Sequence, residues 1–306
     1  MALAAAVAAV AAFGATLPAS RPRDSPPLAF PLTSGLDGPK EPFPDLLTSE
    51  ASKSLSLIVP MYNEEERLGV MMDETMTYLE GRAQADRGFS YELILVDDGS
   101  SDATAAVAAA YVDQFSPDVV RLCRLPANRG KGGAVRAGML AARGEMLLMV
   151  DADGATQFSD LDRLEAALNA LAAGHEPPLA VAVGSRAHLQ DDAVAERTFF
   201  RNLLMHVFHS LVSTLCVSGI RDTQCGFKLF SRAAAQLIFP HMHLERWAFD
   251  VEALYIAQRL AIPVAEVSVN WEEIPGSKLS VVQASIQMAI DLVRIRLAYT
   301  LGFWSV

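Results

Sequence analysis

The sequence predicts an α/β protein with a mostly parallel sheet flanked by helices, and three observations support this class. The short apolar runs are continuous rather than alternating, as expected of strands that helices cover on both faces. Stretches with helical spacing lie between these runs from Leu55 onward, which is typical of a doubly wound sheet. Three of the runs end in polar residues, and ligands of such sheets bind beyond the carboxyl ends of the strands.

The expected elements alternate regularly along the chain. Strands are expected at residues 55–60, 91–96, 119–125, 145–150 and 180–184. Helices are expected near residues 64–80, 102–115, 131–142 and 160–173. A chain of 306 residues is long enough for one large α/β core, so we assign residues 54–278 to a single domain.

The composition excludes one class of partner. The formal net charge is −11, so the chain has no broad basic surface and is expected not to bind nucleic acid. The three cysteines, Cys123, Cys216 and Cys225, lack the paired spacing of a zinc site or a disulfide framework. We interpret them as buried thiols.

The first 50 residues differ from the rest of the chain. Residues 1–20 contain no ionisable side chain, and this apolar run approaches the roughly 20 residues that span a bilayer as a helix. We interpret it as a membrane anchor, with a cleaved signal peptide and an organelle transit peptide as alternatives. Arg21 and Arg23 follow directly, and the positive-inside tendency then places the rest of the chain in the cytosol. Residues 21–53, rich in Pro, Gly and Ser, are expected to be a flexible linker.

Polar motifs follow three of the expected strands. A lone Asp-x-Asp is a weak signal, because turns are rich in aspartate for local hydrogen-bonding reasons. Three polar strand ends along one parallel sheet indicate a ligand site. The motifs are Pro60-Met61-Tyr62-Asn63-Glu64, Asp97-Asp98-Gly99-Ser100 and Asp151-Ala152-Asp153-Gly154.

The third motif predicts a metal site. Asp151 and Asp153 are separated by one residue just after a strand, so both carboxylates can turn toward one point. Mg²⁺ or Mn²⁺ prefers oxygen ligands and binds through one or two carboxylates together with substrate phosphates. A nucleotide diphosphate is therefore the expected ligand.

A glycine-rich segment, residues 128–133, supplies positive charge where a strand gives way to a helix. Its glycines let the backbone approach a phosphate at the favourable end of the helix dipole, and Lys131 adds a cation. The segment lacks the spacing of a P-loop. An ordinary glycine-rich turn with a solvated lysine is the alternative.

These four motifs together resemble the family 2 glycosyltransferases, which have the Rossmann-like GT-A fold. Further segments resemble the branch of that family that glucosylates dolichyl phosphate: residues 184–189, 221–228, 245–252 and 270–278. The resemblance implies transfer of glucose from UDP-glucose to dolichyl phosphate, giving dolichyl β-D-glucosyl phosphate for protein N-glycosylation. It also implies Mg²⁺ or Mn²⁺ as the cofactor and the endoplasmic reticulum membrane as the location, with the catalytic domain facing the cytosol.

The resemblance also implies roles for individual residues. Asp151 and Asp153 are expected to hold the metal, and Asp153, Arg186 and Asp222 are expected to be catalytic. Mannosyl relatives often carry a metal-binding Gln where this chain has Ala155, so the third ligand is left open among Thr156, Gln157 and water. The residues expected to contact the donor are Pro60, Tyr62, Glu64, Asp97, Asp98, Lys131 and Asp151.

The expected acceptor needs less base catalysis than a sugar hydroxyl does. A phosphate monoester has a second pKa of about 6 and is largely dianionic at neutral pH. We therefore expect basic side chains to orient it for in-line attack at the glucose C1, with inversion. Asp222 has two open roles, as a base or as the partner that orients a cation. The expected cations are Arg186, Arg201, Lys228 and Lys278.

Two apolar helices are expected to meet the membrane lipid. Residues 199–216 carry an apolar stripe at helical spacing, and residues 279–306 form a C-terminal amphipathic helix in which charged side chains interrupt any spanning run. We expect both to lie in the membrane interface. The alternative is that each packs on the sheet.

Three other functions compete with this interpretation. A dolichyl-phosphate mannosyltransferase would use GDP-mannose with the same fold and acceptor. A sugar nucleotidyltransferase would need a glycine-rich Lys/Arg loop at the first strand, and residues 60–64 do not form one. A non-catalytic nucleotide-binding subunit is disfavoured because every expected acidic position is filled.

Overall fold

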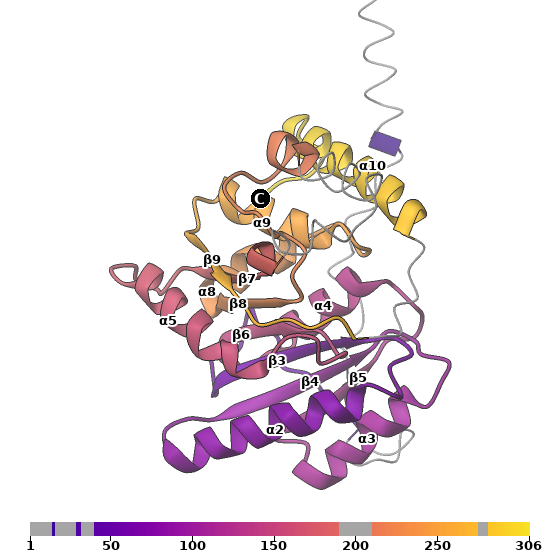
Figure 1. The fold of residues 1–306 in the computed structure, drawn as a ribbon, viewed down its shortest axis with the longest axis vertical. Helices are drawn as coiled ribbons and strands as arrows, with labels where there is room; N and C mark the ends of the chain where they lie inside the picture. Colours follow the sequence, from indigo (N-terminus) through magenta and orange to yellow (C-terminus); the bar gives the residue numbers. More distant parts are fainter. Residues whose placement is uncertain (1–13, 16–28, 32–39, 190–209, 275–280) are drawn as a thin grey trace, which may run out of the picture.

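The computed structural model describes residues 14–15, 29–31, 40–189, 210–274 and 281–306, and their centre is a seven-stranded sheet (Figure 1). The strand order is β5-β4-β3-β6-β8-β7-β9. Neighbours pair in parallel except at β8, which is antiparallel to both β6 and β7. The predicted fold class is therefore confirmed. The strands are β3 (Lys53–Met61), β4 (Tyr91–Asp97), β5 (Val120–Arg124), β6 (Gly144–Val150), β7 (Val181–Ser185), β8 (Phe227–Ser231) and β9 (Val264–Ser268).

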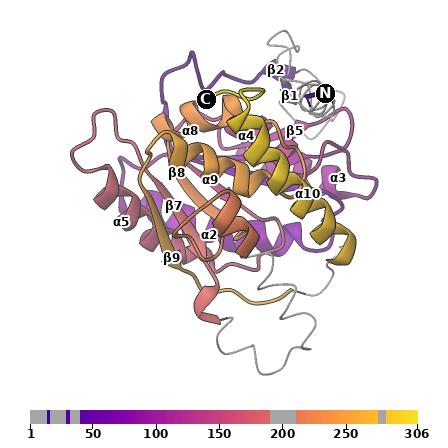
Figure 2. The ribbon, with the colours of Figure 1, turned by 90° about the horizontal axis from the view of Figure 1, so that it is seen from above.

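Helices cover both faces of the sheet. On one face lie α2 (Leu68–Ala85), α3 (Thr104–Phe115), the short η1 (Phe158–Asp160) and α5 (Leu161–Ala172). On the other lie α4 (Lys131–Leu140), α8 (Arg232–Ile238), η2 (Phe239–His241) and α9 (Phe249–Arg259). The last helix, α10 (Val281–Thr300), lies outside α9 (Figure 2). A separate two-stranded sheet pairs β1 (Ala29–Pro31) with β2 (Lys40–Pro42).

The five expected strands and the four expected helices between them are all present, with shifted ends. The largest shift is at α2, which begins at Leu68 rather than near residue 64. Glu64 there forms an ion pair with Arg67 and donates its backbone N–H to Thr104 Oγ1 at 2.6 Å, so this stretch forms a turn before the helix. The sequence did not predict β8, β9, α8 or α9, which are short and follow no regular alternation.

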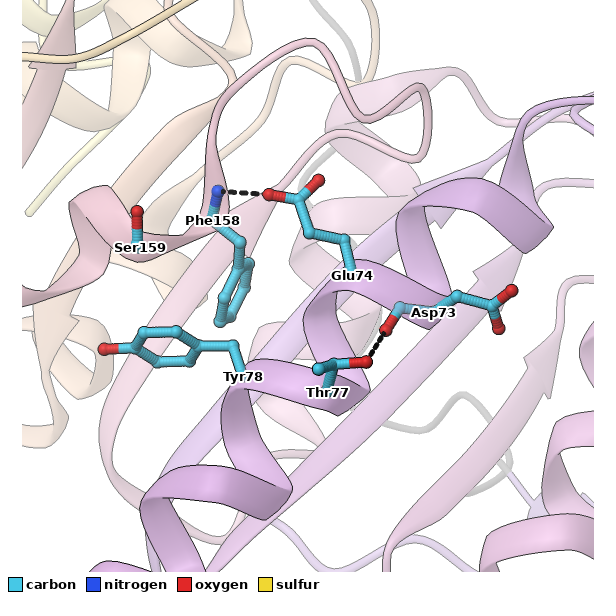
Figure 3. A pocket seen from close by; sticks show the side chains of 6 residues that line it. All are labelled: Asp73, Glu74, Thr77, Tyr78, Phe158 and Ser159. Carbon is cyan, nitrogen blue, oxygen red and sulfur yellow. Dashed lines mark hydrogen bonds between the residues drawn. The ribbon is translucent and has the colours of Figure 1, made fainter.

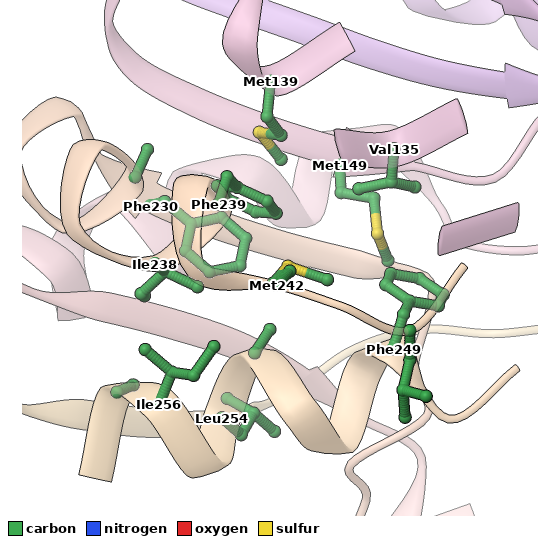
Figure 4. Packing of buried hydrophobic residues seen from close by; sticks show 14 of the residues in the cluster. Val135, Met139, Met149, Phe230, Ile238, Phe239, Met242, Phe249, Leu254 and Ile256 are labelled. Atoms are coloured by element: carbon green, nitrogen blue, oxygen red, sulfur yellow. The ribbon is translucent and has the colours of Figure 1, made fainter. Parts of the chain in front are cut away.

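The core on the α4 side holds the helices close to the sheet. Its aromatic centre is the edge-to-face pair Phe230 and Phe239, with ring centroids 5.1 Å apart (Figure 4). Gly138 of α4 allows the closest approach, since a Cβ there would come within 2.5 Å of Ile58 Cγ2 on β3. This close packing fixes the N-terminus of α4, and with it Lys131, beside the carboxyl ends of the parallel strands.

The structure describes only part of the segments that were predicted to contact the membrane. The proposed anchor lies outside the described residues apart from positions 14–15, as does most of the proposed helix 199–216, of which residues 210–215 are helical. The C-terminal helix is present as α10. Among the described residues, no helix has the length and apolar character to span a membrane.

Candidate functional site

The carboxyl edge of the parallel strands brings together most of the predicted site residues. Asp97 is the last residue of β4, and Asp151 directly follows β6. Arg186 directly follows β7, and Lys131 is the first residue of α4. Because β8 runs in the opposite direction, it is the segment before its first residue, Phe227, that reaches this edge.

Asp151 and Asp153 turn away from the core at the end of β6, and both are partly exposed. Lys131 Nζ lies 2.6 Å from Asp151 Oδ1. Burial lowers the pKa of Lys131, but the carboxylates of Asp151, Asp250 and Asp153 outweigh it, so the pKa is raised and the ammonium stays charged. Asp153 Oδ1 accepts the backbone N–H of Ala155 at 3.0 Å, which orients that carboxylate locally.

Asp98 holds the glycine-rich segment in place. Its two carboxylate oxygens accept the backbone N–H groups of Arg129 and Gly130 at 2.7 and 2.8 Å. Burial raises the pKa of Asp98, and these two N–H groups oppose the rise. Gly130 has φ +89°, and a Cβ there would come within 2.6 Å of the Glu245 carbonyl oxygen, so only glycine fits. The predicted phosphate loop is therefore a fixed structure.

The first two strand ends are joined to each other. Ser101 donates its backbone N–H to Asn63 Oδ1 at 2.8 Å, and the Asn63 N–H is donated to Ser100 Oγ at 3.0 Å. Asp97 is almost fully buried and accepts the Ser100 N–H at 3.0 Å. Tyr62 projects outward and is 46% exposed, which leaves its ring open to a ligand.

Arg186 and Asp222 form a two-pronged ion pair. Arg186 Nε and Nη2 lie 2.7 and 3.0 Å from the two oxygens of Asp222. Burial opposes ionisation of Asp222, but Arg186 outweighs it and lowers the pKa of that carboxyl. The guanidinium also lies 5.4 Å from the ring centroid of Trp271, which follows β9. The structure thus brings the two predicted acceptor-side residues together.

The other three predicted acceptor cations differ in placement. Lys228 lies within β8 and is 1% exposed, where it forms an ion pair with Asp250. Its contact with an acceptor phosphate stays a prediction. Arg201 and Lys278 lie outside the described residues.

Further residues at this edge were not predicted to act there. Asp250 lies in the first turn of α9, where it is buried, and its charge acts on both Lys131 and Lys228. Glu245 pairs with Arg129, and its carbonyl oxygen accepts the Gly133 N–H at 3.0 Å. The available signal was the alternation of Asp250 and Glu252 with the apolar Phe249 and Val251 at the start of α9.

The structure also places the three residues around the open third metal ligand. Ala155 is buried, and its carbonyl oxygen accepts the Glu272 N–H at 2.9 Å. Thr156 pairs with Trp271 in an isolated bridge, whereas Gln157 is exposed. The described residues contain no group of three or more His, Cys, Asp or Glu side chains arranged around one point.

A surface hollow lies elsewhere, between α2 and η1 (Figure 3). None of the predicted site residues line it. Glu74 accepts the Phe158 N–H there at 3.1 Å, and Tyr78 packs edge-to-face on Phe158 with centroids 5.3 Å apart. We assign the hollow to the packing of α2 against η1.

The sheet order and the carboxylates at its edge define a GT-A glycosyltransferase. The model of Glycosyl transferase family 2 matches residues 56–239. Human dolichyl-phosphate beta-glucosyltransferase is 55% identical over 267 residues, covering 87% of this chain and 82% of its own, and the Dictyostelium discoideum enzyme of that name is 51% identical over 274 residues, covering 88% and 83%. The chain therefore belongs to glycosyl transferase family 2 and, within it, to the dolichyl-phosphate β-glucosyltransferases.

Solved structures agree on the fold. Glucosyl-3-phosphoglycerate synthase from Mycobacterium tuberculosis, in complex with Mn²⁺ and UDP-glucose, superposes with a TM-score of 0.52. The match covers 82% of this chain and 81% of that one at 18% identity. At that identity the likeness supports the GT-A fold alone.

Proposed function

We propose that this enzyme transfers glucose from UDP-glucose to the phosphate of dolichyl phosphate, with inversion at the glucose C1. One observation carries the proposal: a carboxylate pair at the end of β6 and an orienting arginine at the end of β7 share one edge of the sheet. The carboxylates suit a nucleotide diphosphate with its metal, and the arginine suits a second phosphate. The 55% identity to human dolichyl-phosphate beta-glucosyltransferase supports glucose as the transferred sugar and dolichyl phosphate as the acceptor.

Asp151 and Asp153 are the residues that we propose would hold Mg²⁺ or Mn²⁺. The fit is supported by the contact of Asp151 with Lys131, because it shows a charged carboxylate that already takes a cation at 2.6 Å. The metal, when bound, would neutralise charge that develops on the departing UDP. Lys131 would then face the same diphosphate from the N-terminus of α4. The described residues do not identify a third ligand.

The donor's uridine is proposed to lie along the first two strand ends. Tyr62 offers an exposed ring, and the buried Asp97 is held by Ser100 and the nearby Arg124. Pro60 lies in β3 behind this surface, and Glu64 borders it with its oxygens held by Arg67. Asp98 acts on the donor indirectly, because it fixes the turn that ends at Lys131.

Arg186 is proposed to orient the acceptor phosphate. Of the two roles open for Asp222, the geometry favours the orienting one, because both of its oxygens are engaged by Arg186 and its pKa is lowered. A carboxyl with a lowered pKa is a poor proton acceptor. The acceptor phosphate, largely dianionic at neutral pH, would attack without a strong base.

The membrane is proposed to contact α10. Four exposed apolar side chains recur at helical spacing on its outer side, and Leu301 continues the row directly after the helix. The four are Ile286, Ile290, Val293 and Leu297. Gln224 of the acceptor-side segment lies 3.0 Å from Met288 Sδ, so α10 adjoins the proposed phosphate site. We further propose an anchor at residues 1–20, a linker at 21–53, a catalytic domain at 54–278 and an interfacial helix at 279–306, located at the cytosolic face of the endoplasmic reticulum membrane.

The proposal is tested by glucose transfer in membranes that carry the protein. Radiolabelled UDP-glucose and dolichyl phosphate should give labelled lipid with Mg²⁺ or Mn²⁺ and none with a chelator. Asp153→Ala should lower the rate by roughly 10²- to 10³-fold, the scale for loss of a group that stabilises developing charge. Asp162→Ala, an exposed aspartate on α5, is the matched control and should keep full activity.

Two results would contradict the proposal. Transfer that continues without a divalent cation, or full activity of Asp153→Ala, would remove the mechanism. Unlabelled GDP-mannose should not compete with UDP-glucose, and strong competition would favour the mannosyl alternative.

A further inference from the structure

The segment from Asp222 to Lys228 connects the two halves of the candidate site. At its start, Asp222 holds the guanidinium of Arg186. Near its end, the Gly226 carbonyl oxygen accepts the Asp151 N–H at 3.1 Å, and a Cβ on Gly226 would come within 2.0 Å of Asp151 Oδ2. The position of this segment therefore sets both Asp151 and Arg186.

Lys228 and Asp250 fix the segment from the protein interior. Lys228 Nζ donates to the Cys225 carbonyl oxygen at 2.6 Å and forms an ion pair with Asp250. The side chains of Lys228 and Asp250 are only 1% and 6% exposed. Asp250 in turn is anchored in the first turn of α9, whose preceding loop packs on the glycine-rich segment through Gly133. The turn at Cys225 and Gly226 is thus tied to two helices.

The buried ion pair of Lys228 and Asp250 indicates that the position of this turn must be fixed. Burying two charges is costly unless their contact is close and further hydrogen bonds satisfy them. An apolar side chain in place of Lys228 would fill the same space but would not donate to the Cys225 carbonyl oxygen. The pair consequently contributes orientation of the backbone more than it contributes packing.

We propose that Lys228 and Asp250 are positioning residues for the transfer reaction. Their pair holds the turn at Cys225 and Gly226, and through that turn it sets Asp151 for the donor diphosphate and Arg186 for the acceptor phosphate. In this role neither side chain would touch a substrate, so it is an alternative to the predicted direct contact between Lys228 and the acceptor. The inference rests on the proposed function of the site.

Lys228→Met tests the proposal, because it keeps the length of the side chain and removes the donor. The affinity for UDP in the presence of Mn²⁺, measured by calorimetry on the full chain, should fall by roughly 10- to 100-fold, as for other residues that orient metal ligands. The KM for dolichyl phosphate should rise with it. Lys228→Arg, which keeps charge and donors, should restore part of both. Lys53→Met, at the opposite edge of the sheet, is the matched control and should change neither.

Gly226→Ala tests the same turn without removing a charge. Its added Cβ would displace the Asp151 carboxylate, so the affinity for UDP with Mn²⁺ should fall by a similar factor. Gly81→Ala, where an added Cβ meets nothing within 4 Å, is the control and should bind normally. If Lys228→Met does not fold, Asp250→Asn tests the pair from its other side: it removes the carboxylate that holds Lys228, and the affinity for UDP with Mn²⁺ should fall.

Distinct outcomes separate this inference from the proposed function. If the wild-type chain does not bind UDP with Mn²⁺, the proposed function fails. If it does, and Lys228→Met raises only the KM for dolichyl phosphate, direct acceptor contact is correct and the positioning role is overturned. A loss of kcat in Asp250→Asn at unchanged affinity for UDP would instead identify Asp250 as a catalytic base and would also overturn it.

Discussion

Carboxylate side chains have different surroundings at the two edges of the central sheet. At the amino edge, the carboxylate of Glu92 is fully buried and accepts from Ser56 Oγ, from Arg121, and from both the backbone N–H and Nε of Arg143. At the carboxyl edge, Asp151 meets one ammonium and remains about one-third exposed. A saturated, buried carboxylate stabilises the fold, whereas a partly engaged and accessible one is able to bind a ligand.

A substitution at the amino edge should lower the stability of the fold without weakening UDP binding, and this is the largest effect that we expect. Glu92→Gln leaves the buried Arg121 without its counter-charge, which should lower the free energy of unfolding by about 3–5 kcal/mol. Urea unfolding measures this loss. The folded variant should bind UDP as the wild type does, and Glu145→Gln, exposed on the same edge, should change stability by less than about 0.5 kcal/mol. A loss of UDP affinity at unchanged stability would break the comparison.

Asp98 lies between the two extremes, since it is buried yet serves the site. Asp98→Ala leaves the N–H groups of Arg129 and Gly130 without their acceptor, which should cost about 1–3 kcal/mol of stability and weaken UDP binding together. Asp98→Asn retains one acceptor oxygen and should fall between alanine and wild type. Titration with UDP and urea unfolding are the paired measurements. Unchanged binding in the alanine variant would assign Asp98 to the fold alone.

The ion pair of Arg186 with Asp222 should reveal itself in the pH dependence of stability. The lowered pKa of Asp222 means that the pair stabilises the fold above the ordinary value of 3.8 and loses this effect as pH falls through the folded pKa. The difference in melting temperature between wild type and Arg186→Gln should therefore be largest near pH 7 and shrink below about pH 4.

The exposed Arg87 supplies the control for that measurement. Arg87→Gln should show a small difference in melting temperature that hardly varies with pH. A pH-independent difference for Arg186→Gln as well would mean that its effect comes from packing.

The smallest expected effect is on the reactivity of the cysteine thiols. Burial raises the pKa of Cys225 to about 11, and that of Cys123 to about 12, so neither should react with a maleimide at neutral pH in the folded protein. Labelling followed by mass spectrometry should show reaction only after unfolding. Rapid labelling of Cys225 in the folded chain would indicate that the turn beside Asp151 opens readily.

The donor half of the site could be predicted from the sequence because its determinants are local. Asp97 ends β4 and Asp151 directly follows β6, and parallel strands end at one edge of a sheet. The phosphate role expected for the glycine-rich segment stays a prediction. The contact of its Arg129 N–H with Asp98, 31 residues earlier, became visible only in the fold.

The acceptor half depends on pairings that sequence reasoning does not reveal. Arg186 and Asp222 are 36 residues apart. One pairing on the donor side is equally hidden, since Arg129 and Glu245 are 116 residues apart. Lys228 was expected at the acceptor phosphate because a lysine offers a point charge to a phosphate. In the structure it lies in β8, between β6 and β7, where every side chain of the strand is buried.

The bond between Arg186 and Asp222 also bears on how such enzymes diversify. It closes the base of the long excursion between β7 and β8. Relatives with insertions or deletions within that excursion are therefore expected to keep its two ends in register.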